Sequence, residues 1–133
     1  MLYPKFKKVL LDNLVLSEGT SAIAGISGGI DSMVMLDLLC RCRESLGFEI
    51  HIAHVNYSLR GIDSERDEAL VRDAASEYGA KISVLHKKPS SGENLQDSAR
   101  NIRRNFFTKI AAQYPSSVVV LGHNMEDQAE TIL

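Results

Sequence analysis

Four short apolar segments alternate along this chain with longer segments of helical periodicity. The short segments cover residues 20–26, 48–55, 81–86 and 117–121, and each is bounded by glycine or polar residues. Apolar runs of this length are typical of strands buried on both faces in a parallel sheet. Because parallel strands need crossover connections, which are usually helices, the alternation predicts an α/β fold with helices on both faces of the sheet.

The segments between these strands fit helices over 31–46, 64–78 and 94–114. Helices are also expected over 5–16 and over 125–133. The last of these reaches residue 133 without a C-cap glycine or a basic last turn. We therefore expect a truncated piece of a longer protein, whose terminal apolar residues are covered by a following element or by self-association. The buried stripe expected on 94–114 consists of Leu95, Ala99, Ile102, Phe106 and Ile110.

Composition excludes several classes of protein. Of the 133 residues 44% are hydrophobic, and the net charge is only -2, so a disordered chain is excluded. The chain has no Trp, four Phe and four Tyr, which argues against a single-strand binder built on stacked aromatic rings. Cys40 and Cys42 lie in an apolar segment and are expected to be reduced core residues. No segment is long and apolar enough for a membrane span or fits a cleavable signal peptide, so a cytoplasmic protein is expected.

The segment Ser27-Gly28-Gly29-Ile30-Asp31-Ser32 lies between the first strand and the helix that follows it. Two glycines allow a tight turn, and the free amides and dipole at a helix start favour an anion. The segment lacks the lysine of a Walker A loop and does not fit GxGxxG, so Mg²⁺ or distant arginines would have to complete a phosphate site. The alternative is a plain strand-to-helix turn in which Ser27 and Asp31 act as caps.

Four ordered motifs carry a resemblance to a known family. The SGGxDS segment resembles the pyrophosphate-binding loop of the N-type ATP pyrophosphatases, the PP-loop superfamily. Residues 53–61 (AHVNYSLRG) resemble HVNHGLRG, residues 98–107 (SARNIRRNFF) resemble an AAR-x-x-R helix ending in FF, and residues 121–131 (LGHNMEDQAET) resemble LGHNADDQAET. Together these motifs are similar to those of the tRNA(Ile)-lysidine synthetases, over about residues 20 to 133.

The resemblance implies a ligase that forms a carbon–nitrogen bond, with ATP and Mg²⁺ as cofactors. Its partners would be free L-lysine and the isoleucine tRNA with a CAU anticodon. ATP would adenylate the 2-oxygen of the wobble cytidine and release pyrophosphate, and the lysine ε-amine would then displace AMP. This chain would be the ATP-binding and adenylating part, one domain over residues 1–133.

The resemblance also implies roles for single residues. The nucleotide would contact the phosphate loop, the end of the second strand and the turn after the fourth, which are Ser27, Gly28, Gly29, Ile30, Asp31, Ser32, Ala53, His54 and His123. Asp31 would also lie near Mg²⁺. Catalytic roles would fall to Asp31, Arg100, Arg103, Asp127 and Glu130.

For several of these residues, the sequence alone also allows a purely structural role. Arg100 and Arg103 are three apart and share a helix face, which is either a phosphate site or a solvated basic face. Asp127 and Glu130 have the same spacing on the expected last helix, where they would bind Mg²⁺ or, by resemblance, the lysine amine, unless they only favour the helix start. His54 is otherwise a satisfied strand-end histidine.

The chain departs from the family pattern at two positions. Glu126 replaces an aspartate, and Tyr57 replaces a histidine. Two rival functions remain. One is another PP-loop enzyme, either a tRNA thiolase or an amidotransferase synthetase, and the other is a nucleotide-binding fragment that is inactive on its own. Taken together, the sequence predicts a doubly wound α/β domain with strand order 3-2-1-4 and the nucleotide at the carboxyl edge between strands one and four.

Overall fold

A computed structural model describes residues 16, 18–59, 61–90, 94–121 and 129–130. Its centre is a sheet in the order β3-β2-β1-β4-β5, in which the first four strands are parallel and β5 is antiparallel to β4. The predicted order 3-2-1-4 is therefore confirmed. The strands are β1 (Ser21–Gly25), β2 (Glu49–Asn56), β3 (Lys81–His86), β4 (Ser117–Leu121) and β5 (Ala129–Glu130).

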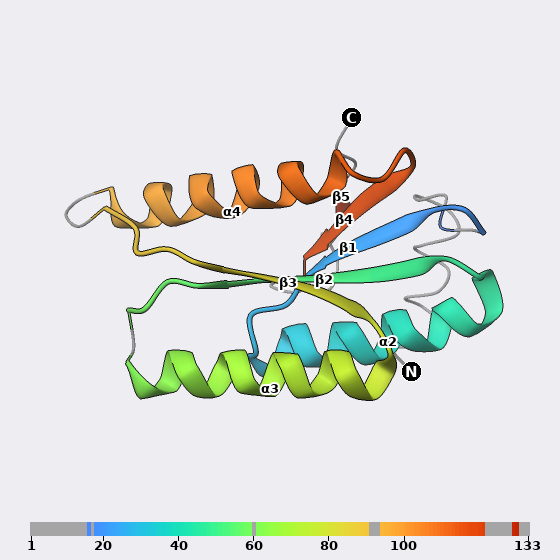
Figure 1. Ribbon diagram of the computed structural model, residues 1–133, viewed down its shortest axis with the longest axis horizontal. Coiled ribbons are helices and arrows are strands. Elements are labelled where there is room, and N and C mark those ends of the chain that lie inside the picture. The colour runs from blue at the N-terminus through green and yellow to red at the C-terminus, as the bar shows by residue number, and fades with distance from the viewer. Residues whose placement is uncertain (1–15, 17, 60, 91–93, 122–128, 131–133) are drawn as a thin grey trace.

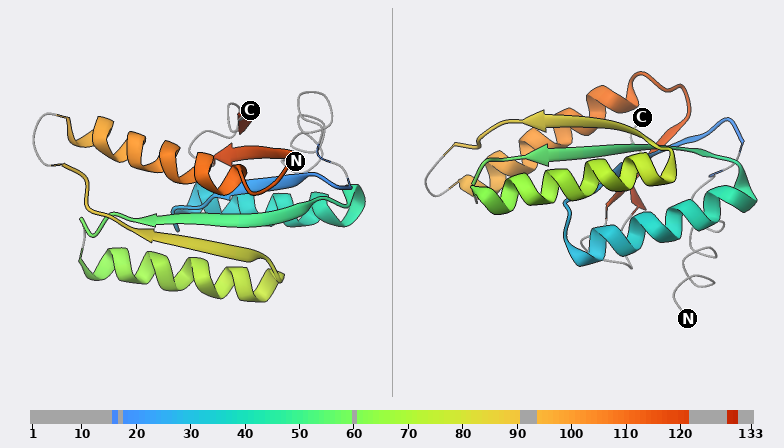
Figure 2. Two further views of the ribbon diagram at one scale, coloured as in Figure 1. Left: turned by 45° about the horizontal axis from the view of Figure 1, so that its top comes forward. Right: turned by 60° about the horizontal axis from the view of Figure 1, so that its bottom comes forward.

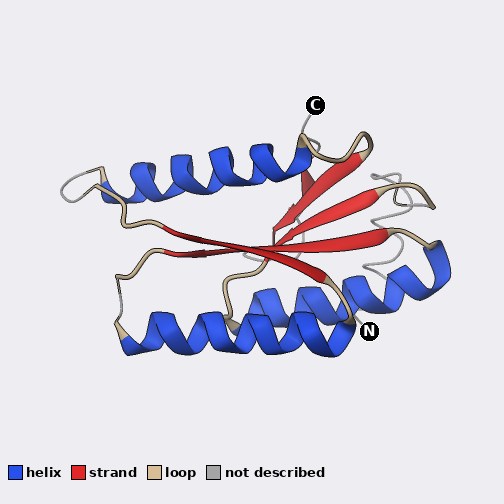
Figure 3. Ribbon diagram, viewed as in Figure 1, coloured by secondary structure: helices blue, strands red, loops and turns tan. Residues whose placement is uncertain are grey.

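In the described part of the chain, three helices cover the two faces of the sheet. Helices α2 (Ile30–Leu46) and α3 (Ile62–Tyr78) lie on one face and α4 (Leu95–Ala111) lies on the other (Figures 1 and 2). Figure 3 shows the same arrangement as a layer of strands between layers of helices. The chain therefore has the doubly wound architecture that the alternating segments predict.

The central strands β1 and β4 are largely apolar because both of their faces are buried. Ala22 and Ala24 of β1 pack into the core under α2 and α3, whereas Ile23 between them packs into the core under α4. Cys40 and Cys42 are free and buried on α2, as predicted. Within the described residues, no helix is both long and apolar enough to cross a membrane.

Two predictions about the second half of the chain need correction. Of the stripe predicted on α4, Ile110 is buried in the core as predicted, but Phe106 is only partly buried, and Phe107 and Ala111, each one residue further along, complete the face turned to the sheet. Ala129–Glu130 form a strand, not part of a helix, and pair with Val119 and Val120. A strand here covers the open edge of β4, whose backbone groups would otherwise lack partners on that side. The helix expected over 5–16 lies outside the described residues, apart from Leu16.

Candidate active site

A pocket of about 580 Å³ lies where the parallel strands end. From β1 the chain continues to β2 by way of α2 on one face, whereas β4, on the other side of β1, is reached through α4 on the opposite face. Such switch points are the usual ligand sites of open α/β sheets. The pocket is lined by Gly25, Ile26, Ser27, Gly29, Ile30, Asp31, Ser32, Ala53, Val55, Tyr57, Arg103, Phe107 and Leu121.

The Ser32 hydroxyl shapes the loop between β1 and α2. Its Oγ accepts hydrogen bonds from the Ser27 amide at 3.2 Å, the Gly28 amide at 3.1 Å and the Ser27 hydroxyl at 3.1 Å. The same hydroxyl donates to the Gly29 carbonyl at 3.0 Å, and Ser27 Oγ accepts from the Gly29 amide at 3.2 Å. Ser32 is buried, so it holds the turn closed from beneath instead of projecting into solvent.

The start of α2 offers free amides to the pocket. The first helical hydrogen bond runs from the Met33 amide to the Gly29 carbonyl at 3.0 Å. The amides of Ile30, Asp31 and Ser32 have no acceptor in the described part of the chain, and no side chain caps this helix. Free amides at the positive end of a helix dipole form an anion site.

Two glycines are required here for different structural reasons. Gly28 has φ +95°, and a Cβ at that position would lie 2.9 Å from Asp67 Cβ on α3. A Cβ on Gly25 would lie 2.7 Å from Phe107 and 2.8 Å from Leu121, the side chains of the pocket wall. Gly29 has φ -75°, which any residue adopts, and faces the pocket. Of the two loop glycines predicted to admit a ligand, only Gly29 lines the pocket.

The structure separates the two arginines predicted to share a role. Arg103 is partly buried and lines the pocket, while Arg100 is exposed and its Nη1 lies 3.7 Å from Asp97 Oδ1. Tyr57 lies beside Arg103, and its hydroxyl donates to the Ala99 carbonyl at 3.3 Å. Burial raises the pKa of Tyr57, and the Arg103 guanidinium opposes this rise. The sequence motifs indicate no role for Tyr57 beyond its departure from the family pattern.

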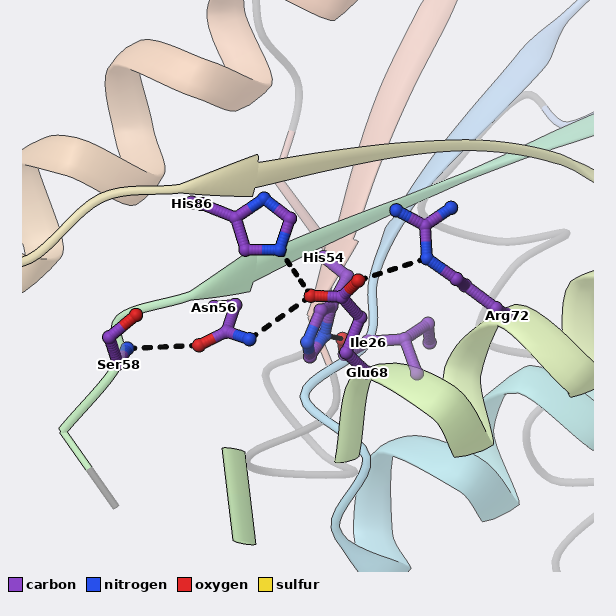
Figure 4. A network of polar contacts seen from close by, with 7 residues as sticks. All are labelled: Ile26, His54, Asn56, Ser58, Glu68, Arg72 and His86. Atoms are coloured by element: carbon purple, nitrogen blue, oxygen red, sulfur yellow. Dashed lines mark hydrogen bonds and ion pairs between the residues drawn. The ribbon is translucent and has the colours of Figure 1, made fainter. Parts of the chain in front are cut away.

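His54 points away from this pocket although its neighbour Ala53 lines it. Its ring is buried, and Nδ1 lies 2.7 Å from the Ile26 carbonyl (Figure 4). Because a carbonyl only accepts, Nδ1 carries a proton, and the bond ties the end of β2 to the start of the phosphate loop. The buried Nε2 has no hydrogen-bond partner among the described residues and adjoins a smaller pocket of about 180 Å³.

Glu68 on α3 organises the chain beside this pocket (Figure 4). It accepts hydrogen bonds from Asn56 Nδ2 at 3.0 Å and Arg72 Nε at 3.0 Å, and it contacts His86. Asn56 Oδ1 in turn accepts the Ser58 amide at 2.9 Å, where the backbone has φ 58°. These hydrogen bonds, that of Asn56 foremost, lower the pKa of Glu68 to about 2. Pattern reasoning did not single out Glu68, since its partners are distant in sequence.

Three of the predicted site residues come from the segment that follows β4. His123 and Asp127 lie outside the described residues. Glu130 lies on β5 opposite Val119, so the helical spacing that paired it with Asp127 does not apply. Asp31 is the acidic residue among the described residues of the pocket wall. In the described part of the chain, no three His, Cys, Asp or Glu side chains gather as a metal site.

Free amides, an arginine and apolar walls at a sheet switch point define a nucleotide-binding α/β domain. The chain belongs to the PP-loop domain family of ATP-binding proteins, whose model matches residues 2–133.

The sequence is similar to proteins named tRNA(Ile)-lysidine synthase. The relative from Dehalococcoides mccartyi is 32% identical over an alignment of 138 positions, which covers 100% of this chain and 29% of the relative. The relative from Bacillus cereus is 38% identical over 124 residues, 90% of this chain and 26% of the relative. The chain thus spans less than a third of the length of these relatives.

A solved structure with a similar fold is the U34-tRNA thiolase NcsA from Methanococcus maripaludis with its 4Fe-4S cluster. The two chains superpose with a TM-score of 0.73 at 25% sequence identity, over 95% of this chain and 45% of the thiolase. The similarity confirms the fold predicted from the alternating segments.

Proposed function

We propose that this chain is the ATP-binding and adenylating domain, over residues 1–133, of a tRNA(Ile)-lysidine synthetase, a ligase that joins lysine to the isoleucine tRNA with a CAU anticodon. One observation carries the proposal. The free amides of the SGGIDS loop and the Arg103 guanidinium, predicted from separate motifs, line one pocket. The names of the similar proteins support the choice of substrate.

The pocket suits ATP in size and in the chemistry of its walls. Its volume of about 580 Å³ lies in the usual range of small-molecule sites. In this proposal the amides at the start of α2 and Arg103 bind the β- and γ-phosphates. The apolar side chains of Val55 and Phe107 contact the adenosine, next to the Ala53 backbone.

Mg²⁺ would enter with the nucleotide. Asp31 is exposed at the start of α2 and offers a carboxylate to the ion. Mg²⁺ takes its other ligands from phosphates and water in many such sites. The ion would supply charge neutralisation, while the loop amides and Arg103 hold the pyrophosphate as the leaving group.

The proposed reaction has two steps. The 2-oxygen of the wobble cytidine attacks the α-phosphorus of ATP, and the bond to pyrophosphate breaks. The lysine ε-amine then attacks C2 of the activated base, AMP leaves with the oxygen, and a proton is released from the amine. Asp127 and Glu130 are proposed from the family resemblance to receive this amine, and His123 is proposed to contact the nucleotide.

The rival enzymes receive less support from this chain. A thiolase of the cluster type would need cysteine ligands, and the chain has only Cys40 and Cys42, both buried on α2. No observation on this chain favours an amidotransferase synthetase. The remaining rival is a nucleotide-binding fragment without activity of its own.

The deciding test uses a protein of the relatives' full length that carries this segment. We expect pyrophosphate release that depends on the CAU-anticodon tRNA, followed by incorporation of labelled lysine. Asp31→Asn should impair pyrophosphate release, while Asp127→Asn should mainly raise the lysine requirement. Pyrophosphate release without lysine incorporation into the tRNA would contradict the lysidine assignment and leave a different PP-loop enzyme. We also expect the 133-residue chain alone to bind ATP and transfer no lysine.

A further inference from the structure

A second, larger hollow lies on the other flank of α4. Its volume is about 960 Å³, and one wall is the chain that follows β3 while the other is the first four turns of α4. Figure 1 shows the chain that leaves β3 at the same end of the molecule as the first turns of α4. Its lining includes Lys87, Lys88, Asn101, Asn105, Phe106 and Lys109. We call this hollow the lysine groove.

Hydrogen bonds fix both walls of the lysine groove. The Ser90 amide donates to Ser98 Oγ at 2.9 Å, which joins the loop wall to the helix wall. The Lys87 amide donates to the Asn56 carbonyl at 3.1 Å, which fixes the loop wall to the end of β2. The groove is therefore a built feature of the fold, with a defined width between two anchored walls.

The lysine groove carries unbalanced positive charge. Lys87, Lys88 and Lys109 are exposed, and none forms an ion pair with a described residue. Asp97 is the acidic residue among the described lining residues, and its carboxylate already lies 3.7 Å from Arg100. Three cations along a hollow of this size favour a polyanion, since a single small anion would contact only one of them.

The polar groups between the lysines point to the same kind of ligand. Asn101, Asn105 and Lys109 are four residues apart on α4, so they form one ridge along the groove. Amide side chains donate to phosphate oxygens and to base edges. Phe106 is partly buried in the groove and offers an apolar surface to a ribose or a base.

The position of the groove relates it to the ATP pocket. Arg103 and Phe107 line the ATP pocket, whereas Ile102 and Phe106, each one residue earlier on the same helix, line the lysine groove. One helix separates the two, and the diameter of a helix with its side chains is about 10–12 Å. A polyanion bound in the groove would therefore pass within reach of a nucleotide bound in the ATP pocket.

We propose that the lysine groove binds the phosphate backbone of the substrate RNA and guides one of its bases toward the ATP pocket. The proposal rests on the proposed function, because it takes RNA as the second substrate. The net charge of -2 does not reveal this surface, because Lys109 is distant in sequence from the adjacent Lys87 and Lys88 and joins them only in the fold.

The test compares RNA binding by the protein and by the variant Lys87→Gln/Lys88→Gln. The probe is a fluorescein-labelled anticodon stem-loop with CAU in its loop, measured by anisotropy over a range of salt concentrations. Loss of two phosphate contacts to unpaired RNA should reduce the salt slope by about 1.4 and weaken binding roughly 25-fold at 0.1 M salt. ATP binding should stay unchanged, since neither lysine lines the ATP pocket.

A charge-matched control is Arg41→Gln/Lys81→Gln. Arg41 lies on α2, on the other face of the sheet, and Lys81 lies at the amino end of β3, away from the edge where the strands end. This variant should bind RNA like the unchanged protein. Equal weakening in both variants, or an unchanged salt slope in Lys87→Gln/Lys88→Gln, would overturn the proposal.

A second arm asks whether the groove prefers an acidic protein. Polyglutamate should compete with the stem-loop far more weakly than unlabelled stem-loop does, and equal competition would contradict RNA as the ligand. The result also separates this proposal from the proposed function. RNA bound through the groove without lysine incorporation would refute the lysidine assignment and leave the groove standing.

Discussion

Gly28 and Gly29 are adjacent in the phosphate loop, but the structure gives them different tasks. Gly28 is held at a positive φ against Asp67, whereas Gly29 has an ordinary φ and lines the pocket. A Cβ on Gly29 would lie 3.4 Å from Ser27 Oγ, an ordinary contact distance. The two positions can therefore separate effects on the fold from effects on the ligand.

We expect Gly29→Ala to weaken ATP binding while leaving stability nearly unchanged. The added methyl group occupies the space through which phosphate approaches the amides. Gly28→Ala should instead destabilise the protein, by about 1–2 kcal/mol for the left-handed backbone alone, with a further cost from the contact with Asp67. Calorimetry gives the affinities and urea unfolding the stabilities. Equal ATP affinity in Gly29→Ala and the unchanged protein would contradict phosphate binding at this loop.

Arg103 and Arg100 provide a matched pair on one helix. Arg103→Gln removes the cation of the pocket wall, and hydrogen bonds to charged groups contribute about 1.5–3 kcal/mol, so ATP affinity should fall about 10- to 100-fold. Arg100→Gln removes the same charge from an exposed position beside Asp97 and should leave affinity nearly unchanged. Isothermal calorimetry measures the ATP affinity of both variants. Similar losses in the two would mean that the field of the helix, not contact, binds the phosphates.

The sequence indicated the phosphate loop and Arg103 but not their neighbours, for a physical reason. A loop motif is local, so the residues 27–32 carry its full signal. Gly25 is required because Phe107 and Leu121 approach it from other elements, and no local pattern contains that contact. Tyr57 likewise gains its place from Arg103 and Ala99 on α4.

At the scale of elements, Glu68 joins α3 to the ends of β2 and β3. Its partners Asn56 and His86 end those two strands, and both lie beside the loop that carries Tyr57 (Figure 4). A carboxylate that accepts several hydrogen bonds is favoured in its ionised form. The network therefore links the position of Tyr57 in the pocket wall to the charge of Glu68, which lies outside the pocket.

This link predicts an effect of pH on stability. The pKa of Glu68 is lowered from 4.5 to about 2 in the folded protein, so the unfolded chain binds the proton more tightly. The stability that Glu68 contributes is fully present above pH 4.5 and is lost as the pH falls toward about 2. Glu68→Gln, which resembles the protonated acid, should destabilise the protein at pH 7 and progressively less below pH 4.5.

Urea unfolding of both proteins at several pH values measures this difference. Glu77→Gln on the same helix is the control, because Glu77 is exposed and forms no ion pair with a described residue. Its effect on stability should be small at every pH. A difference between Glu68→Gln and the unchanged protein that stays constant from pH 7 to pH 3 would refute the role of the network.

At the scale of the whole molecule, the order of the parallel strands was predictable and the far edge of the sheet was not. The four parallel strands have strong apolar patterns, and their predicted limits lie within one residue of those observed. β5 has only two residues, Ala129–Glu130, and their placement depends on pairing with β4. Such a short pairing segment has no periodicity of its own to detect.

The ATP pocket joins the two layers of the molecule, which leads to a prediction for the whole fold. Its phosphate loop leads into α2 on one face of the sheet, and Arg103 comes from α4 on the other face. ATP bound as proposed would therefore contact both layers at once. With free MgATP at 100 times its dissociation constant, the free energy of unfolding should rise by about 2.7 kcal/mol if only the folded chain binds.

Hydrogen exchange shows whether this stabilisation reaches both layers. MgATP should slow exchange at the amides of 27–32 and also at the amides of α4 around Arg103, because the ligand contacts both. Adenosine lacks the phosphates and should protect the loop amides far less, while Arg103→Gln should reduce the protection of α4 more than that of the loop. Protection confined to the loop, with α4 unchanged at saturating MgATP, would mean that the nucleotide binds to one layer only and that Arg103 serves another ligand.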